Sequence, residues 1–481
     1  MGTVERVLGP GLAGGSVDHL TLVALAAGIA ALLWVALRRS PRLALVFFLG
    51  VVCFVPYWYG ITVKVYFPPA CLAGLVVVAA LAAGTSWRLT WADWAVGLFL
   101  LLCVAPVLVG AGNRSTVFVA VLQWGLGFVV GRVLGQRVPL SWLSRCVVVV
   151  FSIVAVGAIA EFLLHWNPFI ELSRPNALFQ TWGTLQERGG ITRSEWAFGH
   201  SISLGATLAL SVPIVMSTKL APWLRVVLTL VVFGGVVASF SRTSIVSASL
   251  GLVLSLLFLR NGVPPRLKWG LVAAVSVLAL VLAPKVAGVF SAAGDEATGS
   301  ANYRLALTAL LPDMSVLGVS PSAHRNSAGD LLFGRFHSID SALLLLGLTY
   351  GLLAMGVVVA LFIAGITTVL RGAAVPATVA VVAQLPTVMT VALITQYGMA
   401  LWFFTGLAVS SQALREPSSA GSAGAGMIDA ARMGNRWSRQ RAGRGPIAEG
   451  SPAAMKVTHR LGRTTPPDLR ARAEGKGAHV G

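Results

Sequence analysis

The chain has 481 residues, of which 56% are hydrophobic and 11% are charged, and its formal net charge is +19. Soluble domains contain about 25% charged residues, so the composition excludes a soluble globular protein and predicts one that a lipid bilayer surrounds. The positive charge does not indicate nucleic-acid binding, because outside the C-terminal tail most of it falls in short connections between apolar runs.

A helix that spans a membrane needs about 20 mostly apolar residues. We predict thirteen such helices, near residues 19–37, 43–60, 68–84, 93–111, 115–133, 144–165, 197–216, 225–240, 244–259, 269–284, 342–369, 375–396 and 399–414. The first run is long enough to stay as a helix, and no cleavable signal peptide is evident. The predicted fold is therefore all-α, a polytopic transmembrane helical bundle of about 12–13 spanning helices.

The positive-inside rule gives an orientation, because short cytoplasmic loops are enriched in Lys and Arg. One set of alternate connections carries such residues: Arg38, Arg39, Arg42, Arg88, Arg132, Arg137, Arg145, Lys219, Arg225, Arg260, Arg266, Lys268 and Arg371. We place these connections in the cytoplasm and the bundle, residues 19–414, in the inner (plasma) membrane. The N-terminus, residues 1–18, then lies outside, with long external loops near 166–196 and 285–341 that carry short helices.

The C-terminal segment, residues 415–481, has a different composition from the apolar bundle. It carries 12 Lys or Arg against 5 Asp or Glu and is rich in Gly, Ala, Ser and Pro. This composition predicts a disordered basic tail on the cytoplasmic side. Its arginines either contact anionic lipid head groups or are solvated without a specific partner.

Several arginines fall on the predicted external face, where the topology rule does not require them. They are Arg174, Arg188, Arg193, Arg242, Arg304, Arg325 and Arg335. Together they make that face basic, which suits an anionic ligand. Arg242 lies in ASFSRTSIVS, between two apolar runs with almost no loop. There the side chain of Arg242 either extends past the helix end to reach water or binds an anion. Its planar guanidinium can donate two parallel hydrogen bonds to phosphate oxygens.

Three histidines suggest different roles. His337 precedes an apolar run and is followed by Ser338 and Asp340, either of which is a candidate N-cap. It acts either as a general base toward a hydroxyl or as a loop histidine bonded to the backbone. His200, in AFGHSISLG, is predicted to be a packed or hydrogen-bonded core residue. His165 follows Glu161 by four residues, which predicts a structural pair rather than a metal site.

Several motifs that carry chemistry are missing. The chain has no GxxxxGK[ST] loop, no GxGxxG before a helix and no HExxH. Its four cysteines, Cys53, Cys71, Cys103 and Cys146, lie in or beside apolar runs without metal-ligand spacing. We therefore expect no metal and no cofactor, and nucleotide hydrolysis is unsupported as an energy source.

Four stretches, in this order along the chain, resemble motifs of one known family. They are AFGHSISLGATLALSVPI (197–214), SFSRTSIVSASLGLVLSLL (239–257), YRLALTALLPDMSVLGVSP (303–321) and FHSIDSALLLLGLTYGLLAMG (336–356). The chain resembles the bacterial O-antigen ligase and polymerase family, membrane glycosyltransferases that use polyprenyl-linked sugars. It departs from the family pattern at His200-Ser201, where Pro-Asn is usual, at Ser320 in place of Gly, and at Ser338 in place of Asn.

The resemblance implies a mechanism and its partners. The donor would be a glycan on undecaprenyl pyrophosphate at the outer leaflet, used for surface polysaccharide assembly. Arg242 and Arg304 would hold the pyrophosphate and offset the charge of the leaving group, with Arg188 and Arg193 as further donor contacts. His337 would orient or deprotonate the hydroxyl of a glycan or other acceptor. Besides membrane lipids no further partner is implied, and nucleic acid is not one.

A transporter or flippase of a lipid-linked or anionic solute is the alternative function. Transporters often contain internal repeats and bind their substrates near the bilayer midplane. This chain shows no clear repeat, and its distinctive polar groups lie at the predicted outer edge, which favours an enzyme. The enzyme hypothesis requires Arg242, Arg304 and His337 to converge on one cavity open to the outer leaflet.

Overall fold

The computed structural model describes residues 28–277 except 64, 109, 111, 113, 189, 260 and 261, together with residues 303, 306–325, 331–336 and 338–415. These residues belong to one compact unit, residues 1–417, while the second unit, residues 418–481, lies outside the description. The predictions for the N-terminal segment and the basic tail therefore fall outside the described residues.

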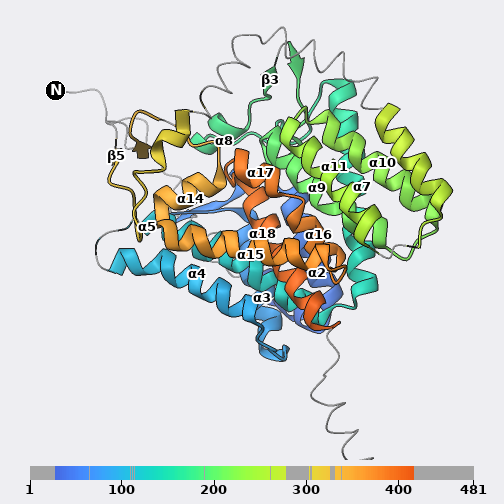
Figure 1. Ribbon diagram of the computed structural model, residues 1–481, viewed down its shortest axis with the longest axis horizontal. Coiled ribbons are helices and arrows are strands. Elements are labelled where there is room, and N and C mark those ends of the chain that lie inside the picture. Colours follow the sequence, from blue (N-terminus) through green and yellow to red (C-terminus); the bar gives the residue numbers. More distant parts are fainter. Residues whose placement is uncertain are drawn as a thin grey trace, which may run out of the picture. The chain divides into compact units, whose positions relative to one another are not determined.

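The described chain is mostly helical (Figure 1). The α-helices are α2 (Pro41–Phe54), α3 (Pro69–Leu81), α4 (Trp91–Leu108), α5 (Arg114–Val119), α6 (Leu126–Arg137), α7 (Leu140–Leu164), α8 (Ala177–Trp182), α9 (Ser201–Ser217), α10 (Pro222–Ala238), α11 (Arg242–Phe258), α14 (Ala342–Tyr350), α15 (Leu352–Leu370), α16 (Pro376–Val382), α17 (Leu385–Thr390) and α18 (Thr395–Ala413). Residues 28–39 and 265–277 are also helical.

Shorter elements connect these helices. A π-helix, η3 (Ala120–Gly125), joins α5 to α6, and 3-10 turns occur at η1 (Tyr57–Tyr59), η2 (Ala82–Gly84), η4 (Trp196–Phe198) and η5 (Thr308–Leu310). Three antiparallel hairpins lie in the connections: β1 (Ile61–Val63) with β2 (Val65–Phe67), β3 (Glu187–Arg188) with β4 (Ile191–Thr192), and β5 (Ala323–Arg325) with β6 (Leu331–Phe333). The all-α prediction missed these hairpins, because strands of two or three residues leave no alternating pattern to read.

Four helical segments in the described chain are long and apolar enough to cross a membrane: Trp91–Leu108, Arg114–Arg137, Leu140–Leu164 and Leu352–Leu370. Shorter apolar helices cover Pro41–Phe54, Pro69–Gly84, Ser201–Ser217, Pro222–Ala238, Arg242–Phe258 and Pro376–Thr390. Where the thirteen predicted runs fall on described residues, the structure is mainly helical. The number of helices that cross a membrane stays a prediction.

The predicted helix over 342–369 is broken into α14 and α15 at Gly351, where φ is 97°. A Cβ at this glycine would lie 2.7 Å from Leu317 Cα. The segment around residues 315–320 satisfies the backbone groups that the break exposes, since Leu352 N donates to Ser315 O (2.9 Å) and Ser320 N donates to Leu348 O (2.8 Å). Broken helices at membrane depth require such partners. The predicted helix over 375–396 is likewise divided, into α16 and α17.

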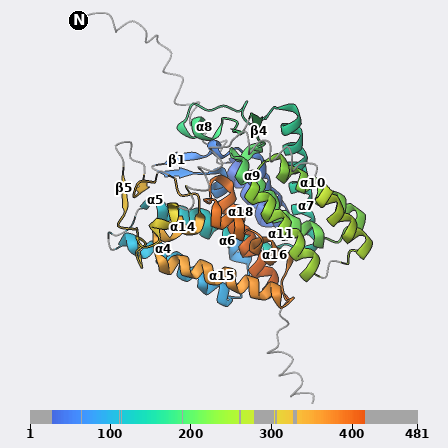
Figure 2. The ribbon, with the colours of Figure 1, turned by 45° about the horizontal axis from the view of Figure 1, so that its top comes forward.

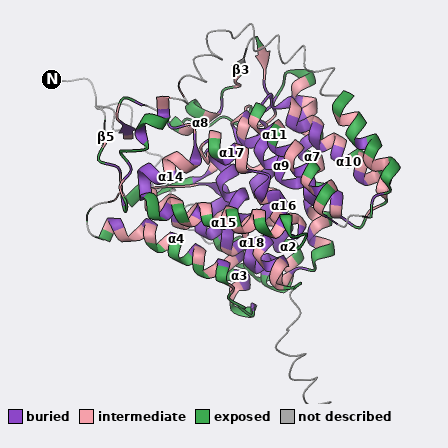
Figure 3. Ribbon diagram, viewed as in Figure 1, coloured by how far each residue is buried: buried purple, intermediate pink, exposed green. Residues whose placement is uncertain are grey.

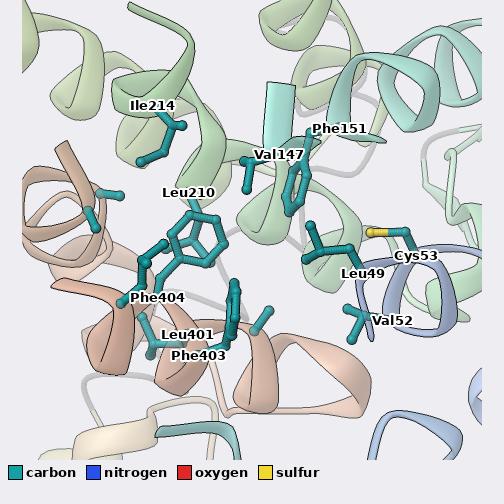
Figure 4. Close-up of a cluster of buried hydrophobic side chains, with 14 of the residues drawn as sticks. Leu49, Val52, Cys53, Val147, Phe151, Leu210, Ile214, Leu401, Phe403 and Phe404 are labelled. Carbon is teal, nitrogen blue, oxygen red and sulfur yellow. The ribbon is translucent and has the colours of Figure 1, made fainter. Parts of the chain in front are cut away.

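The centre of the bundle is the pair formed by α6 and α18, which Figure 2 shows side by side. A Cβ at Gly131 would overlap Phe403 O, and a Cβ at Gly406 would overlap Phe128 O. Small residues allow this close backbone approach, as at many helix pairs in membranes. Figure 4 shows the adjoining apolar core, where Phe404 of α18 contacts Phe151 of α7 with ring centroids 6.0 Å apart.

Burial decreases from the centre of the bundle outward. Figure 3 shows buried residues concentrated on the central helices and exposed residues along the outer faces of α4 and α15. Those outer faces are apolar, with Leu101 at 60% and Ile363 at 56% exposure. A large exposed apolar surface of this kind needs a cover other than water.

Connections that are far apart in sequence meet at two ends of the bundle. At the basic end, Arg137 donates to Gly84 O, Arg132 Nη2 to Arg88 O (2.8 Å) and Arg415 Nη1 to Ala374 O (3.1 Å). The basic end comprises the connections 82–90, 137–140 and 371–375 and the C-terminus of α18. Which end faces the cytoplasm stays a prediction.

The loop end comprises the connections 55–68, 165–200, 239–241 and 391–394. There Trp58 Nε1 donates to Leu172 O (3.0 Å), and Gln396 Nε2 donates to Val55 O (3.2 Å) and to Ala197 O (3.1 Å). Connections far apart in sequence are thus joined directly by hydrogen bonds.

Two of the cations assigned to connections are buried in helices instead. Arg132 in α6 is fully buried and forms a bidentate ion pair with Asp93, with Nε–Oδ1 at 2.7 Å and Nη2–Oδ2 at 2.9 Å. Arg225 in α10 is 6% exposed, and its Nη1 donates to Met216 O (3.1 Å). The charge count alone did not distinguish these arginines from solvated loop residues.

Candidate functional site

Arg242 is the first residue of α11 at the loop end, and it is exposed. The helix begins here because Ser241 caps it, with its Oγ accepting from Ser244 N (3.3 Å) and lying 2.8 Å from Ser244 Oγ. The N–H groups of a first helical turn attract anions, and a guanidinium beside them adds a positive charge. The start of α11 can therefore receive a phosphate-bearing ligand.

Arg193 packs under the turn between α10 and α11. Its side chain is 7% exposed, its Nε donates to Ser239 O (3.1 Å), and Ser194 N donates to Ala238 O (3.1 Å). These bonds fasten the segment after β4 to the junction that precedes Arg242. Arg193 thus supports the position of Arg242, and its direct contact with a donor stays a prediction.

Arg188 lies in β3, and its side chain is outside the described part of the structure. Its predicted contact with a donor is therefore not tested by the geometry. The β3–β4 hairpin that carries it leads directly into Arg193 and Ser194, so the hairpin is anchored at the loop end through its second strand.

The carboxylate of Glu161 organises the first long loop. It accepts hydrogen bonds from Asn167 Nδ2 (2.8 Å), Glu195 N (3.0 Å) and Trp196 N (2.8 Å). The predicted pairing of Glu161 with His165 is wrong, because His165 ends α7 in a left-handed conformation and the loop backbone takes its place. The predicted structural role of Glu161 is correct. Within the described ranges no three His, Cys, Asp or Glu side chains are grouped to hold a metal ion.

His200 is hydrogen-bonded and packed, as predicted. It caps α9 through its Nδ1, which accepts from Ile202 N (3.1 Å), and its ring centroid lies 5.8 Å from that of Trp182. Burial, and next the charge of Arg193, lower the pKa of His200 to about 4. His200 is therefore neutral at pH 7.

Glu195 lies beside these groups and is 1% exposed. Burial raises its pKa to about 8, against the opposing effect of its hydrogen bond from Gln186 N. At neutral pH its carboxyl group is mostly protonated, although the charge of Arg193 acts against this shift. The basic character of the loop end as a whole stays a prediction.

His337 and Arg304 lie outside the described residues, but their neighbours contact one another. Tyr303 Oη donates to Ser338 O (2.5 Å), and the rings of Tyr303 and Phe336 meet edge to face at 5.5 Å. The residue before Arg304 therefore touches residues on both sides of His337. Sequence analysis missed Tyr303, because no local pattern signals a contact between residues about 35 positions apart.

The predicted caps of α14 are wrong. Ser341 caps this helix, with its Oγ accepting from Leu344 N (3.3 Å). Ser338 Oγ instead donates to Asp340 Oδ1 (3.0 Å), one turn ahead of the helix. The chain between position 337 and the helix is therefore a short extended link rather than the first turn of α14.

Helix α17 connects the starts of α11 and α14 (Figure 1). On one side Thr387 Oγ1 lies 2.8 Å from Ser247 Oγ of α11. On the other side Ala342 N, at the start of α14, donates to Val391 O (3.0 Å), just after α17. Both helices therefore begin at the loop end. Convergence of Arg242, Arg304 and His337 on one cavity stays a prediction, since only Arg242 is described.

No family model matches the chain, and no curated protein or solved structure is significantly similar to it. What the protein does must therefore follow from the chemistry of its residues. The described residues at the loop end offer a basic helix start, a buried supporting arginine and a hydrogen-bonded loop. This set of groups suits an anionic ligand.

Proposed function

We propose that the protein is a polyprenyl-diphosphate-dependent glycosyltransferase of the membrane, similar to O-antigen ligases and polymerases. It transfers or polymerises glycan from an undecaprenyl-pyrophosphate-linked donor for surface polysaccharide assembly. The observation that supports this most strongly is the bridge formed by α17. It connects the Ser-Arg start of α11 to the start of α14, and these two helices carry separate family-like motifs.

The proposed setting is the plasma membrane, which the chain crosses many times. The exposed apolar faces of α4, α7 and α15 would contact lipid. The basic end would lie in the cytoplasm, following the positive-inside rule, and the loop end would lie outside with the N-terminus. The donor would then approach from the outer leaflet.

In the proposed reaction, an acceptor hydroxyl oxygen attacks the anomeric carbon of the donor glycan. A C–O bond to the acceptor forms, and the bond from the anomeric carbon to the pyrophosphate oxygen breaks. His337 takes the hydroxyl proton, while Arg242 and Arg304 offset the charge that develops on the departing lipid pyrophosphate. Arg188 is a further donor contact, and Arg193 holds the junction that carries Arg242.

A reconstituted assay tests this function through Arg242. Purified protein in liposomes with an undecaprenyl-pyrophosphate-linked oligosaccharide should release undecaprenyl pyrophosphate and form a longer glycan. Arg242→Ala should slow release by about 100-fold, the usual cost of losing one charge-stabilising donor. The release rate of Arg242→Lys should fall between those of the wild type and Arg242→Ala, because lysine keeps the charge without the planar, forked shape of the guanidinium.

Arg145→Ala is the matched control, since Arg145 is an exposed arginine of α7 at the basic end. It should leave the rate unchanged. A full rate in Arg242→Ala would contradict the proposed role of Arg242. Movement of the intact lipid-linked glycan across the bilayer, with no bond broken, would favour a flippase instead.

A further inference from the structure

A narrow cavity of about 230 Å³ lies inside the bundle, between α4, α15, α16 and α18. Figures 1 and 2 show α15 running beside α4 and close to α16. The lining follows α18 from Leu401 to Ala413, a length of about 18 Å at the rise of an α-helix. The cavity is therefore long relative to its volume, a shape that suits a hydrocarbon chain.

The walls are apolar along most of this length. They include Leu346, Phe362 and Val382, with the indoles of Trp124 and Trp402. Trp402 stacks on Phe99 with ring centroids 5.3 Å apart and planes 12° apart. Neither indole N–H has a hydrogen-bond partner among the described residues. Apart from these two N–H groups, such walls offer mainly dispersion contacts.

Polar side chains line the cavity toward the basic end. Thr90 Oγ1 donates to Asp93 Oδ2 (2.9 Å), and Gln412 Nε2 donates to Ala373 O (3.2 Å). The amide oxygen of Gln412 is buried and has no hydrogen-bond partner in the described part of the chain. A buried acceptor left unpaired costs free energy, so a donor hydroxyl on a ligand would satisfy it.

Three exposed arginines lie within three residues, along the chain, of positions that line this polar end of the cavity. They are Arg88, Arg371 and Arg415. The backbone O of Arg88 accepts from Arg132, and the turn after Arg371 accepts from Gln412 and Arg415. None of the three forms a salt bridge within the residues that the structure describes, where Asp93 is already paired with Arg132.

Exposed tryptophans mark the same end. Trp87 is 42% exposed, and Trp91, which also lines the cavity, is 62% exposed. Tryptophan favours the level of the lipid head groups, where its ring is apolar and its N–H can reach polar atoms. An apolar slot that opens beside cations and tryptophans at this level matches the two parts of a phospholipid.

We propose that this cavity binds an anionic phospholipid, with one acyl chain between α4, α15, α16 and α18 and the phosphate near Arg88, Arg371 and Arg415. The lipid comes from the leaflet at the basic end. The polyprenyl donor is a poorer candidate, because its pyrophosphate would lie at the loop end, beside Arg242. The inference requires the chain to lie in a membrane and does not require glycan transfer.

Lipid binding to the purified full-length protein tests this inference. Native mass spectrometry in detergent would compare dioleoyl phosphatidylglycerol with dioleoyl phosphatidylcholine, which differ in head group and share their acyl chains. Phosphatidylglycerol should bind about 100-fold more tightly, since each basic residue near a lipid surface contributes about fivefold. The triple variant Arg88→Gln, Arg371→Gln, Arg415→Gln should lose this preference.

The matched control is Arg39→Gln, Arg145→Gln, Arg266→Gln, which removes the same charge from exposed arginines farther along the chain from the residues that line the cavity. It should keep the preference, and both triple variants should melt at similar temperatures without lipid. Ala408→Phe, which fills the cavity, should weaken binding of both lipids.

Equal binding of the two lipids to the wild type, or an unchanged preference in the first triple variant, would overturn the inference. Displacement of phosphatidylglycerol by undecaprenyl phosphate would also overturn it, because the cavity would then take a polyprenyl chain. Since no glycan donor is present, either result leaves the transferase proposal to its own assay.

Discussion

Burial, more than any single neighbouring charge, controls the protonation of Glu195 and His200 in the first long loop. The folded state raises the pKa of Glu195 from 4.5 to about 8, so folded protein binds this proton more tightly than unfolded protein. Stability from Glu195 therefore falls as pH rises from 4.5 to 8. The folded state lowers the pKa of His200 from 6.5 to about 4. The stability that His200 contributes therefore rises as the pH increases from about 4 to 6.5.

Between pH 6.5 and pH 8 the opposing effect of His200 no longer operates while that of Glu195 continues, so the wild type should lose stability there. The loss should be at most about 2 kcal/mol, from 1.36 kcal/mol per pH unit for one proton. Glu195→Gln should flatten the melting temperature across this range. Thermal unfolding of the purified full chain would measure it.

His200→Asn is the control, because asparagine can still cap α9. It should remove the opposing rise below pH 6.5, so that stability declines from about pH 4.5 to pH 8. A decline of the same size in Glu195→Gln would show that another group carries the pH dependence. Glu161 and Arg193, which face Glu195, would then be the next groups to vary.

At the scale of single residues, the sequence predicted what local pattern determines. Arg242 is at a helix start because Ser241 and Arg242 interrupt two apolar runs. The cap formed by His200 could also have been predicted, since its partner, the backbone N–H of Ile202, is only two residues farther along the chain. Glu195 was missed, because the carboxylate that binds its backbone N–H lies 34 residues away. Burial of Arg132 was missed for the same reason, since Asp93 is 39 residues away.

At the scale of elements, the contact between α6 and α18 depends on glycine. Gly131→Val should destabilise the bundle by roughly 1–3 kcal/mol or more, because a side chain there meets the backbone of α18 rather than a movable side chain. Gly97→Val in α4 is the matched control, since nothing lies within 4 Å of its Cβ position. Melting temperatures of the two variants would compare them, and equal losses would contradict this account of the α6–α18 contact.

The helices themselves were largely predictable, because apolar runs in a chain of this composition form helices. The break at Gly351 was not, since glycine is common inside membrane helices and its sequence context is mostly apolar. The partners that make the break possible are residues 315–320, about 35 positions earlier. The division between α16 and α17 also depends on tertiary contacts, such as the bond from Tyr397 Oη to Gln384 Oε1 (3.0 Å).

At the scale of the whole molecule, the alternation of connections between two ends was predictable from the charge pattern. The hydrogen bonds at the basic end and at the loop end agree with that alternation. How many helices cross the membrane does not follow from length alone, because several central helices are shorter than a bilayer requires. The geometry around His337 was not predictable, because the partners of its neighbours come from another part of the chain.

The proposed orientation predicts which of two introduced cysteines reacts in intact cells. Ser173→Cys lies at an exposed position of the loop end, and Lys219→Cys lies at an exposed position between α9 and α10. A membrane-impermeant maleimide should label Ser173→Cys in intact cells and Lys219→Cys only after the membrane is opened. The native cysteines give little background, because Cys53, Cys71 and Cys103 are buried and Cys146 is half-buried. Labelling in the reverse order would contradict the orientation.

His337 is proposed to act on the acceptor in glycan transfer, and cells that lack the native gene allow this role to be tested directly. Wild type, His337→Ala and the control His324→Ala would be compared for membrane insertion, long-chain surface polysaccharide and lipid-linked repeat units. His324 is an exposed histidine of β5 in the same loop. We expect His337→Ala to insert normally, make no long chains and accumulate lipid-linked units outside, while His324→Ala resembles the wild type. Normal chain synthesis in His337→Ala would contradict the role of His337, and units accumulating on the cytoplasmic side would contradict the transferase itself.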